Sequence, residues 1–290
     1  MSTAQPFDVC VVGSANLDVV AHAPRLPAAG ETVLGTSYAE HPGGKGLNQA
    51  VAAARAGART TFVSAVGDDQ AGERLVDALR GSGADTSLVR RVPAPTGRAV
   101  ITVDERGENS IVVIPGANTH VDGSSLPTAG VVLVQLEIPL ASVAAALRRG
   151  RDTGAVTILN PAPAATIDRS VLGLVDVLVP NEHEAAHLGP PETLISGGVR
   201  AVVTTLGGAG VRVVTAEREW HQPAFGVDVV DTTAAGDAFC GALAARLAAG
   251  EPLDRAVRFA AAAGALATTV RGAVPSIPTA ASIGELLAAQ

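Results

Sequence analysis

Short runs of β-branched and aliphatic residues alternate with alanine-rich segments along most of the chain. Most of these runs are apolar throughout, which is typical of parallel strands buried on both faces of a sheet. The predicted strands cover residues 8–13, 60–66, 131–135, 156–160, 175–179, 201–206 and 227–231. The predicted helices cover residues 46–56, 70–80, 140–151, 182–188, 236–249 and 252–270. This alternation predicts an α/β fold over residues 1–290, with a doubly wound, mainly parallel sheet, helices on both faces and ligands at the carboxyl ends of the strands.

Two stretches of β-like sequence, residues 17–42 and 97–115, interrupt the alternation. The first has apolar pieces around a loop at residues 24–30 and contains no helical segment. The second is predicted to be a hairpin, with strands at residues 98–104 and 110–114 and a polar turn between them. We predict that the two stretches form a small side sheet. Its alternating Val and Ile side chains then need a cover, which is a substrate, a second subunit or both.

Composition limits the classes of protein to which the chain can belong. Of the 290 residues, 47% are hydrophobic and 17% are charged, so the chain can fill a large core and is not intrinsically disordered. Lys and Arg number 21 against 28 Asp and Glu, a formal net charge of −7 that argues against binding to nucleic acid or an anionic membrane. Any anionic ligand must therefore be bound locally, by backbone amides, helix ends or a metal ion.

The sequence indicates a cytoplasmic location. Residues 1–23 lack a basic leader and are interrupted by Asp8 and Asp18, which is unlike a signal peptide. The best candidate for a membrane span, residues 259–270, is too short to cross a bilayer. Two cysteines are too few for a disulfide framework, in keeping with this location.

The strongest chemical signal is the segment Asp-Thr-Thr-Ala-Ala-Gly-Asp at residues 231–237, which opens an alanine-rich helix. Small residues let the backbone approach a ligand closely, and the free amides of a first helical turn bind anions. Asp237 lies in that positive end, where a carboxylate stays ionised and can accept a proton. A helix N-terminus with a favourably placed carboxylate and no ligand is the alternative interpretation.

Three other glycine-rich or polar segments carry candidate contacts. His-Pro-Gly-Gly-Lys-Gly-Leu-Asn at 41–48 offers Lys45 and Asn48 from a helix start, and it is not a Walker A loop because glycine follows the lysine. Gly-Ser-Ala-Asn-Leu-Asp at 13–18 supplies an amide and a carboxylate that could grip adjacent hydroxyls. Thr-Leu-Gly-Gly-Ala-Gly at 205–210 could pass close to a nucleotide. Taken alone, 41–48 and 205–210 are equally well explained as turns, and 13–18 is better explained as an ordinary loop rich in Asn and Asp.

One motif indicates a different chemistry. His183 and His187 flank Glu184 in an H-E-x-x-H pattern, which on a helix can place two imidazoles around a zinc ion with the glutamate as base. The predicted helix is short, and only Glu217 or Glu219 could supply a distant third ligand. We therefore expect a chance match and no zinc site.

Taken together, these segments resemble the phosphofructokinase B family of carbohydrate kinases, and within it the ribokinases, from about residue 9 to residue 278. The matching segments, in the order of the family, are 13–18, 43–48, 135–137, 160–163, 180–182, 205–210, 231–237 and 272–278. The resemblance implies a ribokinase-like fold in which residues 17–42 and 97–115 form a β-sheet lid. In that family the lid closes over the sugar and often forms the interface of a homodimer.

The resemblance also implies roles for residues of the sugar and catalytic sites. The implied sugar-binding residues are Asn16, Asp18, Gly44, Lys45, Gly46, Asn48, Glu137 and Asp237. Asp237 is the implied catalytic base, which takes the proton from the primary hydroxyl as that oxygen attacks the γ-phosphate of ATP. The amides of Ala234, Ala235 and Gly236 are implied to stabilise the charge on the transferred group, as in-line phosphoryl transfer requires.

Cofactor sites follow from the same resemblance. The residues implied to contact ATP are Asn181, Glu184, Thr205, Leu206, Gly207, Gly208, Ala209, Gly210 and Gly236, with Mg²⁺ near the first two. The residues implied to hold an activating K⁺, largely through carbonyl oxygens, are Asp231, Thr233, Ala267, Val270, Gly272 and Ser276. Two departures affect the nucleotide side: residues 188–200 are a shortened segment, and Ala261 stands where the family often has a polar side chain near the adenine.

The expected activity is ATP-dependent phosphorylation of D-ribose at its 5-hydroxyl to give ribose 5-phosphate. A related sugar or nucleoside kinase is the nearest alternative: a deoxyribokinase, a fructokinase or an adenosine kinase. Asp18 and the short polar lid favour a small sugar, because a nucleoside needs apolar or aromatic walls against its base. A metal-dependent hydrolase and a non-catalytic sugar-binding regulator are the alternatives from other classes. The expected partners are the sugar and ATP, with no nucleic acid and no membrane.

Overall fold

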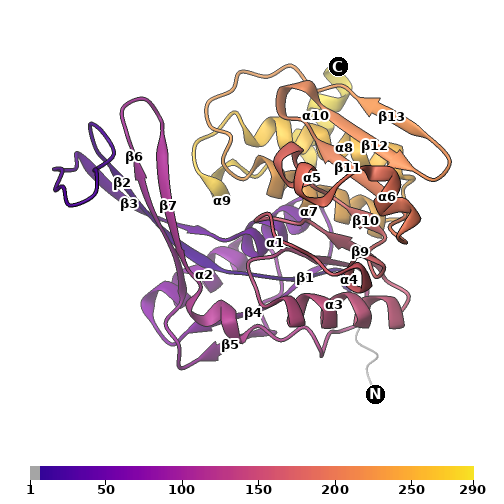
Figure 1. Ribbon diagram of the computed structural model, residues 1–290, viewed down its shortest axis with the longest axis horizontal. Helices are drawn as coiled ribbons and strands as arrows, with labels where there is room; N and C mark the ends of the chain where they lie inside the picture. The colour runs from indigo at the N-terminus through magenta and orange to yellow at the C-terminus, as the bar shows by residue number, and fades with distance from the viewer. Residues whose placement is uncertain (1–6) are drawn as a thin grey trace.

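A nine-stranded sheet forms the centre of the molecule in the computed structural model, which describes residues 7–290 (Figure 1). Its order is β13-β12-β11-β10-β9-β8-β1-β4-β5, and every neighbouring pair is parallel except β11–β12 and β12–β13. The strands are β1 (Phe7–Val12), β4 (Thr60–Gly67), β5 (Val89–Val92), β8 (Ala129–Val134), β9 (Val156–Leu159), β10 (Val177–Leu178), β11 (Ala201–Thr205), β12 (Val211–Thr215) and β13 (Glu219–Gln222). The predicted fold class is confirmed.

The strands β1 and β8 are parallel, but the side on which the chain adds further strands to the sheet changes between them. From β1 the chain proceeds outward through β4 to β5, and from β8 it proceeds the other way through β9 and β10 to β11. Val9 of β1 pairs with Thr60 on one side and Val131 on the other. Loops that follow β1 and β8 therefore leave in opposite directions, and such a switch point opens a crevice at the carboxyl ends of the strands.

Helices cover both faces of this sheet because successive side chains of each strand point to opposite faces. Val9 and Val11 pack in one core cluster with α1 (Lys45–Arg55), α2 (Gln70–Gly81), α7 (Ala235–Ala248), α8 (Leu253–Ala267) and α10 (Ala280–Ala289). Cys10 and Val12 pack in a second cluster with α3 (Leu140–Asp152), α4 (Arg169–Leu172) and α6 (Pro191–Ser196). The remaining helical segments are α5 (Glu182–Leu188), α9 (Ala273–Ser276), η1 (Gly116–His120) and η2 (Gly207–Ala209).

The two stretches that interrupt the alternation form a separate four-stranded sheet, which projects from the main body (Figure 1). Its order is β3 (Ser37–Gly43), β2 (Asn16–His22), β6 (Gly97–Val103) and β7 (Asn109–Ile114). The strands β2 and β6 pair in parallel, and the outer pairs are antiparallel. Asn16 pairs with both Gly43 and Gly97, so the inner end of this small sheet begins next to the end of β1.

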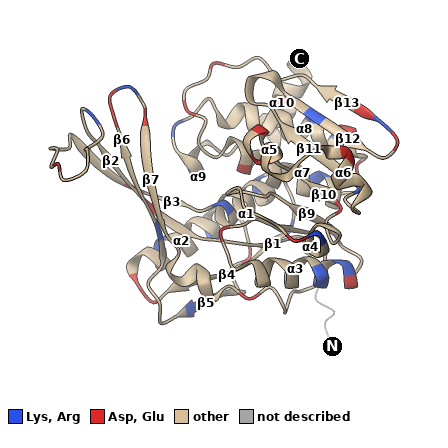
Figure 2. Cartoon of the chain, viewed as in Figure 1, with Lys and Arg blue, Asp and Glu red and all other residues tan. Residues whose placement is uncertain are grey.

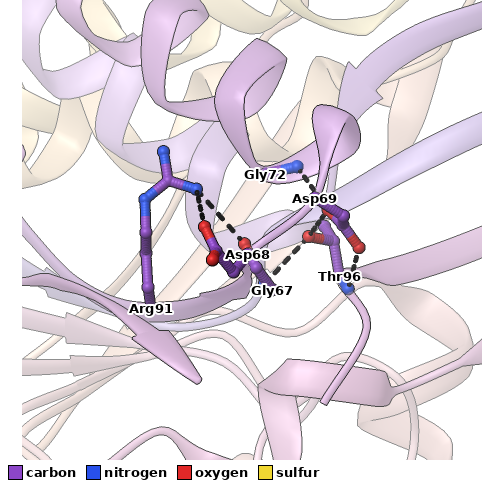
Figure 3. A network of polar contacts seen from close by, with 6 residues as sticks. All are labelled: Gly67, Asp68, Asp69, Gly72, Arg91 and Thr96. Atoms are coloured by element: carbon purple, nitrogen blue, oxygen red, sulfur yellow. Dashed lines mark hydrogen bonds and ion pairs between the residues drawn. The ribbon is translucent and has the colours of Figure 1, made fainter. Parts of the chain in front are cut away.

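A polar network fastens the small sheet to the main body just before β6 (Figure 3). The Asp69 carboxylate accepts hydrogen bonds from the Gly72 amide at 2.8 Å, the Thr96 hydroxyl at 2.6 Å and the Thr96 amide at 2.9 Å. The same hydroxyl accepts a bond from the Gly67 amide at 2.9 Å. Asp69 thus caps α2 and anchors the residue before Gly97, so the small sheet leaves the core from a fixed point.

The structure differs from the sequence-based expectations mainly at the edge of the main sheet. Residues 227–231 form no strand, because they do not pair with the edge strand β13. The backbone amides of Val230 and Asp231 instead bond the carbonyl oxygen of Thr268. The strand expected at 175–179 shortens to β10, and β5, β12, β13 and α10 carry too little periodicity to be predicted.

Surface and membrane features agree with the composition. Figure 2 shows acidic and basic residues distributed over helices, strands and loops of both the main body and the small sheet. Among residues 7–290 no helix is long and apolar enough to span a bilayer. Of the stretch judged to lack a leader, residues 1–6 lie outside the described part of the chain.

Candidate active site

The helices α1 and α7 begin side by side at the switch point, and both start without a side-chain cap. Gly44, the residue before α1, has a φ of 91°, a conformation that suits glycine. A Cβ on Gly46 would collide with the backbone of Gly13 and Ser14, so only glycine lets α1 start directly against the end of β1. These two predicted site glycines therefore set how closely α1 approaches the end of β1.

Asp237, in the first turn of α7, is the centre of the site and is only 8% exposed. One carboxylate oxygen accepts a hydrogen bond from the Asn48 amide at 2.9 Å, and the other accepts one from the Gln49 amide at 2.9 Å. Burial raises the pKa of Asp237, while the Lys45 ammonium and the two amide bonds act in the opposite direction. The result is an oriented carboxylate in a position to accept a proton.

Three buried acceptors around Asp237 and the amides that hold it have no partner among the described residues: Oδ1 of Asp18, Oδ1 of Asn48 and Oε1 of Gln135. Buried polar atoms are normally hydrogen-bonded, so these oxygens await donors from outside the chain. The pKa of Asp18 is raised to about 7, chiefly by burial and further by the charges of Glu137 and Asp237. The structure thus brings together carboxyl groups from β2, the loop after β8 and α7, as predicted.

Glu137, in the loop after β8, bonds both the loop after β1 and the start of α1. Its Oε2 accepts bonds from the Ser14 hydroxyl at 2.6 Å and the Lys45 amide at 3.1 Å. The side chain of Lys45 is largely buried, which favours the neutral amine, but the charges of Asp237, Glu137 and Glu184 prevail and raise its pKa. Lys45 is therefore a cation held among carboxylates, available to a hydroxyl or a phosphate oxygen.

Asn16 is held by a residue that sequence reasoning missed. Asn118, at 1% exposure, donates from its amide to Oδ1 of Asn16 at 2.7 Å and accepts from the Ala15 amide at 2.9 Å. This contact fixes which end of the Asn16 amide faces the site, so its NH₂ group is the end left to donate. Asn118 lies in η1, 102 residues from Asn16 along the chain. The only signal in the sequence that could have indicated it is the short Gly-Ala-Asn segment of a polar turn.

A cavity of about 260 Å³ opens beside the start of α7. The predicted nucleotide residues that line it are Thr205, Gly207, Gly208, Gly210 and Gly236, together with Ala235, whose amide was predicted to stabilise the transferred group. Leu206 and Ala209 belong to the same turn but do not line the cavity, and neither do Asn181 and Glu184. Ala261, where the family often has a polar side chain, also lines the cavity. The other lining residues were not predicted: Val211, Ala224, Phe225, Val227, Val229, Thr232, Phe239, Gly264, Ala265 and Thr268.

The backbone before α7 is shaped for an anion. Ala234 has a φ of 60°, the left-handed region that non-glycine residues rarely adopt, and such strain is concentrated at functional sites. The amide of Ala235 makes a long bond of 3.3 Å to the Thr232 carbonyl. The positive end of the α7 dipole and the amides of its first turn therefore face the region between Asp237 and the cavity.

The glutamate of the H-E-x-x-H motif caps the helix on which the motif lies. Glu184 is buried and forms a capping box with Asn181, in which the Glu184 amide donates to Asn181 at 2.8 Å and the Asn181 amide donates to Glu184 at 2.9 Å. His183 and His187 stack edge to face, with ring centroids 4.6 Å apart. Among the described residues no group of three His, Cys, Asp or Glu side chains could hold a metal ion.

The residues predicted to hold a monovalent cation form two connected loops. The Asp231 carboxylate accepts from the Thr233 amide at 2.9 Å and its hydroxyl at 2.7 Å, and from the Gly272 amide at 2.9 Å. Ala267 ends α8, and Ser276, which ends α9, bonds the Ala273 carbonyl at 2.8 Å. Val270 lies in the loop between α8 and α9, and because its side chain is a hydrocarbon only its backbone carbonyl could contribute.

Comparison with known proteins adds an independent finding. The profile described as pfkB family carbohydrate kinase matches residues 7–280 of the chain. The chain is 39% identical over 292 residues to the ribokinase of Bacillus subtilis, covering 97% of this chain and 99% of that one. Ribokinase from Thermotoga maritima superposes with a TM-score of 0.91 at 35% identity, covering 97% and 99%. Arabidopsis thaliana ribokinase complexed with ribose and ATP superposes with a TM-score of 0.89 at 33% identity, covering 98% and 99%.

Proposed function

The chain belongs to the pfkB family of carbohydrate kinases, and from this premise we propose that it transfers the γ-phosphoryl group of ATP to the 5-hydroxyl of D-ribose. The chain is a kinase: its relatives over nearly its whole length include several ribokinases and also deoxyribokinases. The observation that carries the choice of a sugar is the pair of buried, unpartnered oxygens on Asp18 and Asn48. Adjacent hydroxyls of a small sugar would supply the donors that these acceptors lack.

In this proposal each side chain of the site has one task. Asn16, Asp18 and Glu137 bind hydroxyls, and the amides of Asn48 and Gln49 hold Asp237 ready for the hydroxyl that reacts. Asp237 accepts the proton of that hydroxyl as its oxygen attacks the γ-phosphorus and the bond to the β-phosphate oxygen breaks. The ammonium of Lys45 and the amides at the start of α7 stabilise the negative charge on the transferred group.

The nucleotide occupies the 260 Å³ cavity in this proposal, because its mouth adjoins Gly236 and its walls are apolar enough for a base. Mg²⁺ commonly uses one or two carboxylates together with phosphate oxygens, so Glu184 would contribute through its carboxylate. The raised pKa of Glu184, caused first by burial, fits a carboxyl group that gains from a nearby cation. The metal would supply charge neutralisation at the phosphates.

The experiment that tests the function is a coupled assay of ADP release with ATP, Mg²⁺ and K⁺. D-ribose, 2-deoxyribose, fructose and adenosine are offered as acceptors at equal concentrations. Preference for D-ribose, with product phosphorylated at the 5-position by NMR, supports the proposal. Faster turnover of another acceptor would keep the kinase and reassign its substrate, and release of ADP without any acceptor dependence would contradict the proposal.

We further propose that K⁺ binds between the Asp231–Thr233 and Ala267–Ser276 loops. The side-chain bonds of Asp231 hold these loops together, and no hydrogen bond among residues 7–290 ends on the carbonyl oxygen of Asp231 or Thr233. Such carbonyl oxygens suit a large, hard cation. Replacing K⁺ by Na⁺ at constant ionic strength should lower kcat in the ADP-release assay. Equal rates in the two salts would contradict this assignment.

The small sheet is proposed to act as a lid over the sugar and as the interface of a homodimer. Its outer strand exposes Ile111, Val112, Val113 and Ile114, each 47–60% accessible, which forms an apolar band unusual for the surface of a monomer. A second copy of the chain would cover this band, as two-fold dimers commonly bury identical patches. Analytical ultracentrifugation at micromolar concentration should therefore find a dimer, and Val113→Lys should shift the population to monomer. A monomeric wild-type chain would contradict the proposal.

A further inference from the structure

We infer that Gln49 is a positioning residue that holds the Asp237 carboxylate in the orientation for proton transfer, and that Gln135 and Asn160 fix Gln49 in turn. The inference rests on the proposed function of Asp237 as the base. Gln49 follows Asn48 in α1 and is fully buried, so it is screened from the substrate by its neighbours. It acts through Asp237 rather than on the reacting atoms.

The contacts form a chain of amides from the sheet to the base. The amide nitrogen of Gln49 donates to Oδ1 of Asp237 at 2.9 Å and to Oδ1 of Asn160 at 3.0 Å. The oxygen of Gln49 accepts from the Gln135 amide at 2.6 Å. Asn160 in turn donates to the Val179 carbonyl at 2.9 Å. Residues at the ends of β8 and β9 thus fix an amide that reaches α7.

These contacts allow only one orientation of the Gln49 amide. If it were rotated by 180°, its oxygen would face two acceptors, Asp237 and Oδ1 of Asn160, and the latter is fixed because the Asn160 amide donates to Val179. Gln135, whose Oε1 has no partner among the described residues, then presents its NH₂ group to the Gln49 oxygen. The rigid sheet therefore dictates that a donor points at Asp237. A carboxylate held on both oxygens, by Asn48 and Gln49, has no freedom to turn its proton-accepting lone pair away from the substrate.

The bond from Gln49 also bears on the pKa of the base. Charged or titratable groups face Asp237 from every side: Lys45 on α1, Glu137 after β8, Asp18 on β2, Glu184 on α5 and the Cys240 thiol on α7 itself. Burial and the nearby carboxylates raise the pKa of Asp237, whereas Lys45 and the two amide bonds lower it. Loss of the Gln49 donor should therefore raise this pKa further.

The test compares the pH dependence of kcat, from pH 5 to 9 with saturating D-ribose and ATP, in the wild-type protein and four single variants. Gln49→Leu should move the acid limb upward by about one to two pH units and lower the plateau about 10- to 100-fold. Gln49→Glu keeps nearly the same shape but places a second carboxylate against Asp237 and Asn160. Its acid limb should move further still, because two adjacent carboxylates share a proton.

Gln135→Leu and Gln70→Leu complete the set. Gln135 does not bond Asp237, so its variant should shift the limb less than Gln49→Leu does, and it should add nothing in a Gln49→Leu background. Gln70 is exposed at the start of α2, and Gln70→Leu should behave as wild type. If Gln49→Leu fails to fold, the shifts in Gln49→Glu and Gln135→Leu decide the question.

A merely structural role predicts the opposite order. The isosteric Gln49→Glu would then be the milder substitution, and the acid limb would coincide with that of wild type in every active variant, a result that overturns the inference. An inactive wild-type protein would instead count against the proposed function. The pKa of Asp237 is then followed by carbon-13 NMR of the carboxyl group in the unliganded protein, where an unchanged value in Gln49→Leu would likewise overturn the inference.

Discussion

Asp237→Asn should lower kcat by about 10²- to 10⁴-fold while changing the affinity for D-ribose only slightly. The substitution keeps the volume of the side chain but removes its capacity to accept a proton. Both oxygens of Asp237 accept amide bonds, and the new NH₂ group would face one of those donors, so the side chain would also lose its orientation. Steady-state kinetics measures the loss of kcat, and calorimetric titration of D-ribose measures any change in affinity.

The matched controls for Asp237→Asn are His187→Ala and His183→Ala. Each of these histidines lies on the short α5, and its ring contacts the other ring rather than Asp237. Kinase activity should be retained in both variants. Loss of activity in the histidine variants, with retention in Asp237→Asn, would revive the metal-dependent hydrolase and remove Asp237 as the base.

Asp18→Ala should weaken D-ribose binding roughly 10- to 100-fold, because each hydrogen bond to an ionised carboxylate contributes about 1.5–3 kcal/mol. The unpartnered Oδ1 of Asp18 is the acceptor that would be lost. Isothermal titration of D-ribose in the absence of nucleotide measures the effect directly. An unchanged affinity would mean that the sugar binds elsewhere.

The same residue should give sugar binding a pH dependence. The pKa of Asp18 is about 7, so the carboxyl group ionises between pH 6 and 8, and the affinity for D-ribose should rise over that interval as a stronger acceptor forms. Asp18→Asn should bind more weakly and show a flatter profile. A profile of the same shape in the variant would assign the titration to another group.

Ionisation of Asp18 should have opposite effects on binding and on stability: it strengthens sugar binding but lowers the free energy of unfolding. The folded state raises the pKa of Asp18 from the 3.8 of an unperturbed side chain, so it binds a proton more tightly than the unfolded state does. The free energy of unfolding therefore falls as pH rises from about 4 to about 7. Asp18→Asn lacks this loss and should gain stability relative to wild type between pH 5 and 8, as measured by chemical denaturation.

Most of the fold was accessible from local sequence, because a buried parallel strand requires a run of apolar residues and a covering helix requires its own period. The principal strands and helices were found in this way, and so was the departure at residues 17–42 and 97–115. The strand expected at 227–231 failed for a tertiary reason. A β-branched run becomes a strand only if its backbone pairs with another strand, and here the amides of Val230 and Asp231 bond the Thr268 carbonyl instead.

The chemical groups of the site can be read from local sequence alone. Small residues at 234–236, the glycines at 43, 44 and 46, and the carboxylates of Asp18 and Asp237 are local requirements of close backbone approach and proton transfer, so the pattern displays them directly.

Which of these groups come into contact depends on the fold of the whole chain. Gln49 and Asp237 are 188 residues apart in the chain, and Asn16 and Asn118 are 102 apart. The first pair meets because α1 packs against α7, and the second because η1 packs against β4 and β6 beside the end of β1. No periodicity along the chain encodes these contacts, since they arise from the packing of the whole sheet against its two layers of helices.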